Sequence, residues 1–158
     1  MDSKLRDWKT MILISHDFFH QWRKAVEEKY GKDEANQLTV RFWELVGENT
    51  AASYINKGKF DRDNLAQIVQ GVARSSEIMG ETCEVKEEGD DILLIHTECP
   101  WIKSYEVNGV PGECQAGCDQ WFQTAAKRIN PRFSVKTESC LAAGDNACLR
   151  RFSITSDS

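Results

Sequence analysis

The spacing of apolar residues changes near Gly80, and this change constrains the fold more than any other feature of the chain. Before Gly80, apolar residues recur every three or four positions, which is the period of an amphipathic helix. After Gly80 they recur in short alternating runs, which are typical of strands. The sequence therefore predicts an α+β fold. Its 158 residues predict a single domain, with a helical half (1–80) and a cysteine-rich α/β half (81–158).

Three helices are predicted in the first half. The first ends at Gly31, since glycine commonly terminates a helix. One face of this helix carries Met11, Ile14, Phe18, Trp22, Ala25 and Val26. The second helix begins near Asp33, and the third begins at a capping Asp61 or Asp63 and ends at Gly80. The apolar and aromatic residues on all three are predicted to form core, so this half is interpreted as scaffold.

Two hairpins and one helix are predicted in the second half, and the four strands together form an antiparallel sheet. A turn-rich link at 88–91 joins the strands of the first hairpin. The helix ends at Asn130-Pro131, because proline disfavours the helical conformation of the residue before it. The predicted elements are strands at 82–87 and 92–97, a connection at 101–112, a helix at 113–129, and strands at 133–140 and 148–155.

Five of the six cysteines lie between residues 99 and 148. Cys114 and Cys118 are four residues apart, so they share one face of the predicted helix, turned toward the sheet. Cys148 alternates with Phe152 on the inward face of the last strand. Strict alternation turns Cys140 outward, unless a bulge near the hairpin end reverses it.

This clustering predicts a site built from thiolates. Zinc needs three or four ligands in a tetrahedron, and a helix turn plus a hairpin supply four of them as Cys114, Cys118, Cys140 and Cys148. The same four cysteines, with Cys99 in reserve, also suit an iron-sulfur cluster. Two interpretations without metal stay open: inert thiols buried in the core, and a metal-free reactive site.

Charge and targeting features limit the partners and the compartment. The net charge is -5 with acidic and basic residues interspersed, which disfavours nucleic acid and favours a small-molecule ligand or substrate, or a protein. Polar residues interrupt every apolar run near the start, so neither a signal peptide nor a membrane span is predicted. We expect a cytoplasmic protein without disulfides. The five tryptophans suit a ligand pocket or the interface of a homodimer, and Trp101 is expected to line a pocket.

Several short motifs in the second half occur in the order of a known family. They are Cys99-Pro100-Trp101, the segment 109–119 with its CxxxC pattern, Asn130-Pro131, and Gly144-Asp145-Asn146-Ala147-Cys148. Over residues 96–153 the chain resembles the L-2-amino-thiazoline-4-carboxylic acid hydrolase family. The resemblance implies a hydrolase that opens a cyclic amidine and gives a carbamoyl-cysteine product.

The second half is also similar to the vinyl-reductase-type small-molecule-binding domain of phenol-sensing regulators. In its zinc-bearing members a helix cysteine precedes a Cys-x7-Cys pair in a hairpin, and Cys114, Cys140 and Cys148 match these positions. Thr137 stands where those members have a glutamate. The resemblance therefore does not identify the fourth zinc ligand, and we expect Cys118 to take the place of the missing glutamate.

A hydrolase of this kind needs a nucleophile, and Cys99 is the candidate if His96 activates it, which requires the chain to turn at Glu98. Asp119 and Asp145 are candidate acid or base groups, although carboxylates on a helix surface or in a hairpin turn are more often structural. Two functions remain. One is a C–N hydrolase acting on a small polar heterocycle, and the other is a non-catalytic module that binds or senses a small molecule beside a structural zinc or iron-sulfur site.

Overall fold

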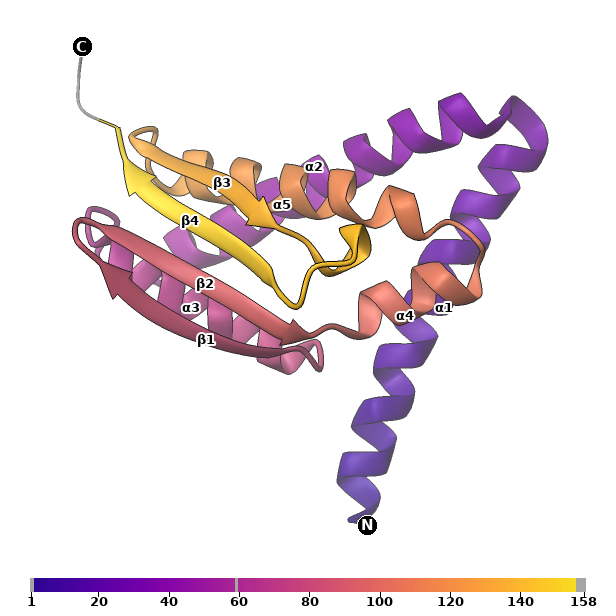
Figure 1. Cartoon of the computed structure of the whole chain (residues 1–158), viewed down its shortest axis with the longest axis horizontal. Coiled ribbons are helices and arrows are strands. Elements are labelled where there is room, and N and C mark those ends of the chain that lie inside the picture. The colour runs from indigo at the N-terminus through magenta and orange to yellow at the C-terminus, as the bar shows by residue number, and fades with distance from the viewer. Residues whose placement is uncertain (1, 59, 156–158) are drawn as a thin grey trace.

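Figure 1 shows a computed structural model of the chain, and the structure describes residues 2–58 and 60–155. Three helices precede a four-stranded antiparallel sheet, so the predicted α+β fold is confirmed. The helices are α1 (Ser3–Tyr30), α2 (Lys32–Lys57), α3 (Leu65–Ile78), α4 (Pro100–Val107) and α5 (Cys114–Ile129), with short 3-10 helices at Pro111–Glu113 and Leu141–Ala143. The strands are β1 (Thr82–Glu88), β2 (Asp91–Glu98), β3 (Phe133–Ser139) and β4 (Cys148–Ile154). None of the described helices is both long enough and apolar enough to span a membrane.

The sheet has the strand order β1-β2-β4-β3, and every neighbouring pair is antiparallel. The pairing of β2 with β4 joins the two hairpins, and it places His96 opposite Cys148 and Leu94 opposite Arg150. Helices α3 and α5 lie against one face of this sheet, and α2 packs along α5 (Figure 1). Inward side chains of the two central strands therefore meet a layer of helices.

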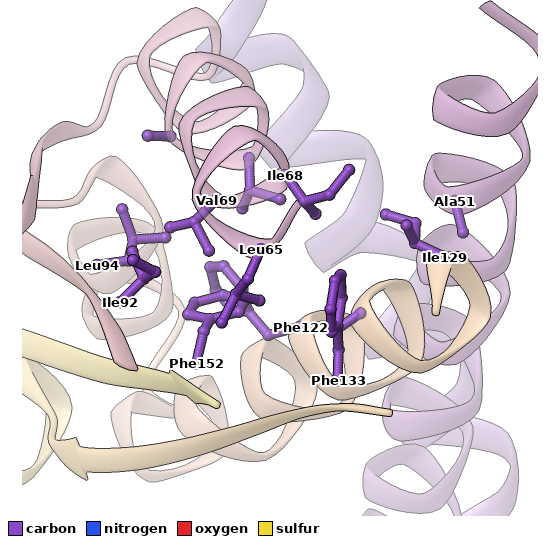
Figure 2. Close-up of a cluster of buried hydrophobic side chains, with 13 residues drawn as sticks. Ala51, Leu65, Ile68, Val69, Ile92, Leu94, Phe122, Ile129, Phe133 and Phe152 are labelled. Carbon is purple, nitrogen blue, oxygen red and sulfur yellow. The ribbon is translucent and has the colours of Figure 1, made fainter. Parts of the chain in front are cut away.

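A hydrophobic core fills the space between α3, α5 and this face of the sheet (Figure 2). Leu94 and Val69 are fully buried there, and the rings of Phe122 and Phe152 pack with their centroids 6.1 Å apart. Burial of each such side chain contributes about 1.5–3 kcal/mol. Because Phe122 is on α5 and Phe152 on β4, this core also fixes the position of the cysteines that these two elements carry.

The apolar face of α1 that was predicted to be core is exposed. Met11 is 61% exposed and Phe18 is 71% exposed, and Ile14 and Trp22 are exposed as well. The buried residues of α1 are Ile12, His16, Phe19, His20 and Arg23. The prediction was wrong because α1 packs against α2 and α4 through an adjacent face. Polar side chains are tolerated on that face where they find partners, as Arg23 does by donating to two oxygens at 2.6 Å.

The segment predicted to be a connection, 101–112, contains most of helix α4. Pro100 occupies the first turn of α4, where its missing N–H removes no helical hydrogen bond. Cys99 stands at the N-cap position, and Gly109 follows the helix with a φ of 73°. The predicted connection is therefore wrong for residues 101–107, which are helical.

Cys140 faces inward because the pairing of β3 with β4 is irregular. The register shifts between Thr137 and Ser139, which reverses the alternation of side chains beyond that point. Cys140 is buried, as is Cys148. Of the two orientations of Cys140 that the sequence left open, the structure shows the one that a bulge produces.

Candidate functional site

A cavity of about 360 Å³ lies between the helices and the sheet, and its wall is formed by α2, α3, α4, α5 and the central strands. Five cysteines line it: Cys99, Cys114, Cys118, Cys140 and Cys148. Most of the remaining wall is apolar or aromatic, including Trp43, Trp101, Ile102, Tyr105 and Phe122. A concave, mostly apolar space with a few polar groups is typical of small-molecule sites.

His96 and Glu81 form a polar pair on the wall of this cavity. The His96 ring is buried, and its Nε2 lies 3.0 Å from Glu81 Oε2 and 3.1 Å from Ser76 Oγ. A carboxylate only accepts hydrogen bonds, so it holds the proton of His96 on Nε2 and leaves Nδ1 with a free lone pair. Among the described residues, Nδ1 has no hydrogen-bond partner. Glu81 and Ser76 therefore fix the orientation of the imidazole on the cavity wall.

Arg150 and Cys118 form a second polar pair on the wall. The Arg150 side chain is 2% exposed, and its guanidinium carbon lies 4.3 Å from the centroid of the Phe122 ring. Its Nη2 donates to Cys118 Sγ at 3.1 Å, whereas the Asp119 carboxylate is 3.8 Å away. Burial acts to lower the pKa of Arg150, but the nearby thiols and Asp119 raise it overall, so this cation stays charged.

Burial keeps the thiols of Cys99, Cys114 and Cys118 protonated at neutral pH. Burial raises the pKa of Cys118 to about 12, although Arg150 acts in the opposite direction. Burial and the carboxylate of Glu81 raise the pKa of Cys99 far above its ordinary value, and the backbone N–H groups at the start of α4 only partly oppose this. A thiol in this setting becomes a nucleophile only when a neighbouring base removes its proton.

The sulfur atoms of Cys140 and Cys148 are in contact. The Cys148 thiol donates to Cys140 Sγ at 3.9 Å, and the backbone N–H of Leu141 donates to Cys148 Sγ at 3.3 Å. Within residues 2–58 and 60–155, no three His, Cys, Asp or Glu side chains are grouped closely enough to hold a metal ion. Cys118, part of the predicted four-cysteine set, is engaged by Arg150 instead. The zinc or iron-sulfur site stays a prediction.

The other predicted site residues lie in different settings. The ring of Trp101 is on the cavity wall and stacks on His16 with centroids 3.6 Å apart. Asp119 accepts a hydrogen bond from Thr137 Oγ1 at 2.6 Å, and Asp145 accepts one from the backbone N–H of Cys140 at 2.7 Å. Neither carboxylate is among the residues that line the cavity. Asp119 thus links α5 to β3, and Asp145 closes the turn after Cys140.

The polar wall residues that were not identified from the sequence include Ser76, Glu81 and Arg150, which form the contacts described above. Arg150 could have been found, because strand alternation places it on the same inward face as Cys148 and Phe152, and a charged residue on such a face is unusual. Glu81 carries no comparable local pattern. It follows α3, and only the pairing of the distant strand β2 brings His96 to it.

Comparison with known proteins bears directly on this cavity. A family model described as L-2-amino-thiazoline-4-carboxylic acid hydrolase matches residues 11–152. The chain belongs to this family. Every residue that lines the cavity falls inside the matched range, so the family assignment covers the candidate site itself. A search of curated proteins found no match to this member of the family.

Two solved structures share the fold of this family member. One is the crystal structure of a trafficking protein particle complex subunit 3 from Naegleria fowleri covalently bound to palmitic acid. It has a TM-score of 0.64 and 10% identity, and the alignment covers 94% of this chain and 97% of that one. The other is the phenol-responsive sensory domain of the transcription activator PoxR with phenol, with a TM-score of 0.61, 11% identity and coverage of 88% and 74%. At these identities the likeness shows the fold, and the resemblance to vinyl-reductase-type domains stays a prediction.

Proposed function

We propose that this chain hydrolyses the ring C–N bond of a small cyclic amidine, and that the reaction takes place in the cysteine-lined cavity. The observation that carries the proposal is the Glu81–His96 pair on the cavity wall, whose imidazole is buried and oriented and has no partner at Nδ1 in the described part of the chain. Such an imidazole can take up and return a proton during a reaction. The family description supplies the class of reaction.

Cys99 is the nucleophile in this proposal. His96 lines the same cavity and removes the proton from the buried thiol. The sulfur then bonds to the amidine carbon, the ring C–N bond breaks, and the departing nitrogen takes the proton from His96. Water next attacks the same carbon and displaces the Cys99 sulfur. One proton of the water returns to Cys99 through His96, and the other stays on the nitrogen of the new carbamoyl group.

Arg150 binds the carboxylate of the substrate in this proposal. The compound in the family description is a carboxylic acid, and Arg150 is a buried cation on the cavity wall. Its nearest carboxylate oxygen, on Asp119, lies beyond hydrogen-bond distance at 3.8 Å. A ligand carboxylate therefore gains a charge-assisted hydrogen bond in an apolar setting, where such bonds are strongest.

Arg150→Gln is expected to raise the KM for L-2-amino-thiazoline-4-carboxylic acid about 10- to 100-fold, because it removes one charge-assisted hydrogen bond worth about 1.5–3 kcal/mol. Steady-state kinetics on this acid and on the same ring without its carboxylate measure the effect. The KM for the carboxylate-free ring should stay unchanged. An equal rise for both compounds would contradict the role of Arg150. Arg128→Gln, at an exposed arginine outside the cavity, is the matched control.

A second candidate function is a non-catalytic module that binds or senses a small molecule beside a structural zinc. The observation that favours it is the separation of Cys140 Sγ and Cys148 Sγ, which is 3.9 Å. Two sulfurs on one tetrahedral zinc, each at about 2.3 Å, lie roughly 3.8 Å apart. Cys114 is the third cysteine proposed for this ion, and zinc there would tie α5 to the β3–β4 hairpin. An iron-sulfur cluster is the other occupant proposed for these thiols.

Elemental analysis of protein purified without oxygen separates these occupants. The zinc proposal predicts one zinc per chain in the wild type and in Cys83→Ser, whose cysteine lies outside the cavity, and its loss in Cys148→Ser. Iron with visible absorption would assign the cluster instead. Protein that contains neither zinc nor iron would rule out both the zinc site and the iron-sulfur cluster, and the hydrolase proposal alone would remain.

A further inference from the structure

The exposed face of α1 carries a continuous row of residues, called the α1 stripe below. Its members are Asp7, Met11, Ile14, Phe18, Trp22, Ala25 and Lys29, and all of them are exposed. They follow one another at intervals of three or four residues, so they lie in one line along the helix. Apolar side chains at this spacing are normally covered by another surface. Trp22 partly packs against Phe42 of α2, with ring centroids 5.3 Å apart, but it is still 37% exposed, and Met11 and Phe18 are 61% and 71% exposed.

The surroundings of α1 leave this stripe open. Helix α1 packs against α2 and α4, and the residues that it buries there lie on an adjacent face. The N-terminal part of α1 extends beyond the sheet and the other helices (Figure 1). Single exposed apolar residues are ordinary, but a row that combines Met11, Phe18 and Trp22 on a projecting helix is typical of an interface.

We propose that the α1 stripe binds the α1 stripe of a second copy of this chain, antiparallel to it and related by a two-fold axis at Phe18. The intervals between the residues of the stripe are symmetric about Phe18: read outward from it, they are four, three and four residues both toward Asp7 and toward Lys29. Each residue therefore meets a defined residue of the second copy. The facing pairs are Phe18 with Phe18, Ile14 with Trp22, Met11 with Ala25, and Asp7 with Lys29.

The chemistry of these pairs favours a second copy over an unrelated partner. A two-fold interface must be complementary to itself, since each surface meets an identical one. Large apolar residues meet at the centre, and Met11 meets the small Ala25, which leaves room for its side chain. At each end of the interface Asp7 of one copy faces Lys29 of the other, so the opposite charges attract. A parallel arrangement would instead place Asp7 against Asp7 and Lys29 against Lys29, which repel.

The mass of the full chain in solution, measured by sedimentation or light scattering, tests the proposal without reference to hydrolysis. We expect the wild type to have twice the 18.0 kDa of one chain. Phe18→Glu buries two opposed carboxylates at the axis and is expected to weaken the dimer at least about 100-fold. Leu13→Glu is the matched control, because Leu13 is an equally exposed apolar residue of α1 outside the stripe, and this variant should stay dimeric. A monomeric wild type, or a dimer that survives Phe18→Glu, would overturn the proposal.

A charge exchange tests the direction and the register of the two helices. Asp7→Lys places like charges at both ends of the interface and is expected to weaken the dimer roughly tenfold, since each exposed ion pair is worth up to about 1 kcal/mol. Combining Asp7→Lys with Lys29→Asp restores opposite charges, so the double variant should recover the wild-type dissociation constant. A double variant that is weaker than either single variant would overturn the antiparallel pairing.

Discussion

Replacing His96 by glutamine is expected to lower kcat for hydrolysis of the cyclic amidine about 10²- to 10⁴-fold, the usual contribution of a general acid–base group. Glutamine retains an amide that can bond to Glu81 and Ser76, so the cavity wall keeps its shape while the proton-transfer group is lost. The measurement is steady-state kinetics on L-2-amino-thiazoline-4-carboxylic acid, with circular dichroism to show that the variant is folded.

His20→Gln is the matched control for this substitution. His20 is a buried histidine whose Nε2 lies 3.0 Å from Ser104 Oγ, and it does not line the cavity. Its replacement should lower stability without lowering kcat by more than a few-fold. A His96→Gln enzyme that keeps its wild-type kcat would remove His96 from the reaction.

Cys99→Ala is expected to lower kcat at least about 10³-fold, because it removes the atom that bonds to the substrate carbon. Binding of the substrate should change little, since Arg150 and the aromatic wall are intact, and titration of tryptophan fluorescence can measure it through Trp101. Cys83→Ala is the control, at a half-buried cysteine outside the cavity. Turnover at the wild-type rate in Cys99→Ala would show that water attacks directly.

Much of the fold was predictable because its determinants are local. The change of period near Gly80 separates helices from strands, and the turn residues between strands mark the two hairpins. The same reasoning failed where local and distant causes compete. The eight-residue helix α4 was missed because turn-forming residues such as Gly109 follow it closely. The inward orientation of the Cys140 side chain depends on a register shift between β3 and β4, which residue spacing alone does not predict.

The cysteine wall of the cavity was predictable in the same way, since the four-residue spacing of Cys114 and Cys118 and the alternation at Cys148 act over short distances. The contact between Glu81 and His96 was not predictable, because the pairing of distant strands brings these two residues together. The face of α1 was misjudged for a different reason. Periodicity shows that a helix has an apolar face, but it does not show whether the core of the same chain or another molecule covers that face.

The most direct test of the proposed hydrolysis is to incubate the purified wild-type chain with L-2-amino-thiazoline-4-carboxylic acid in water enriched in oxygen-18. Mass spectrometry then follows both the ring and its product. The proposal predicts catalytic turnover to a ring-opened carbamoyl product that carries one heavy oxygen, because water supplies the oxygen of the carbamoyl group. An intact ring after prolonged incubation with an equimolar amount of folded protein would contradict it.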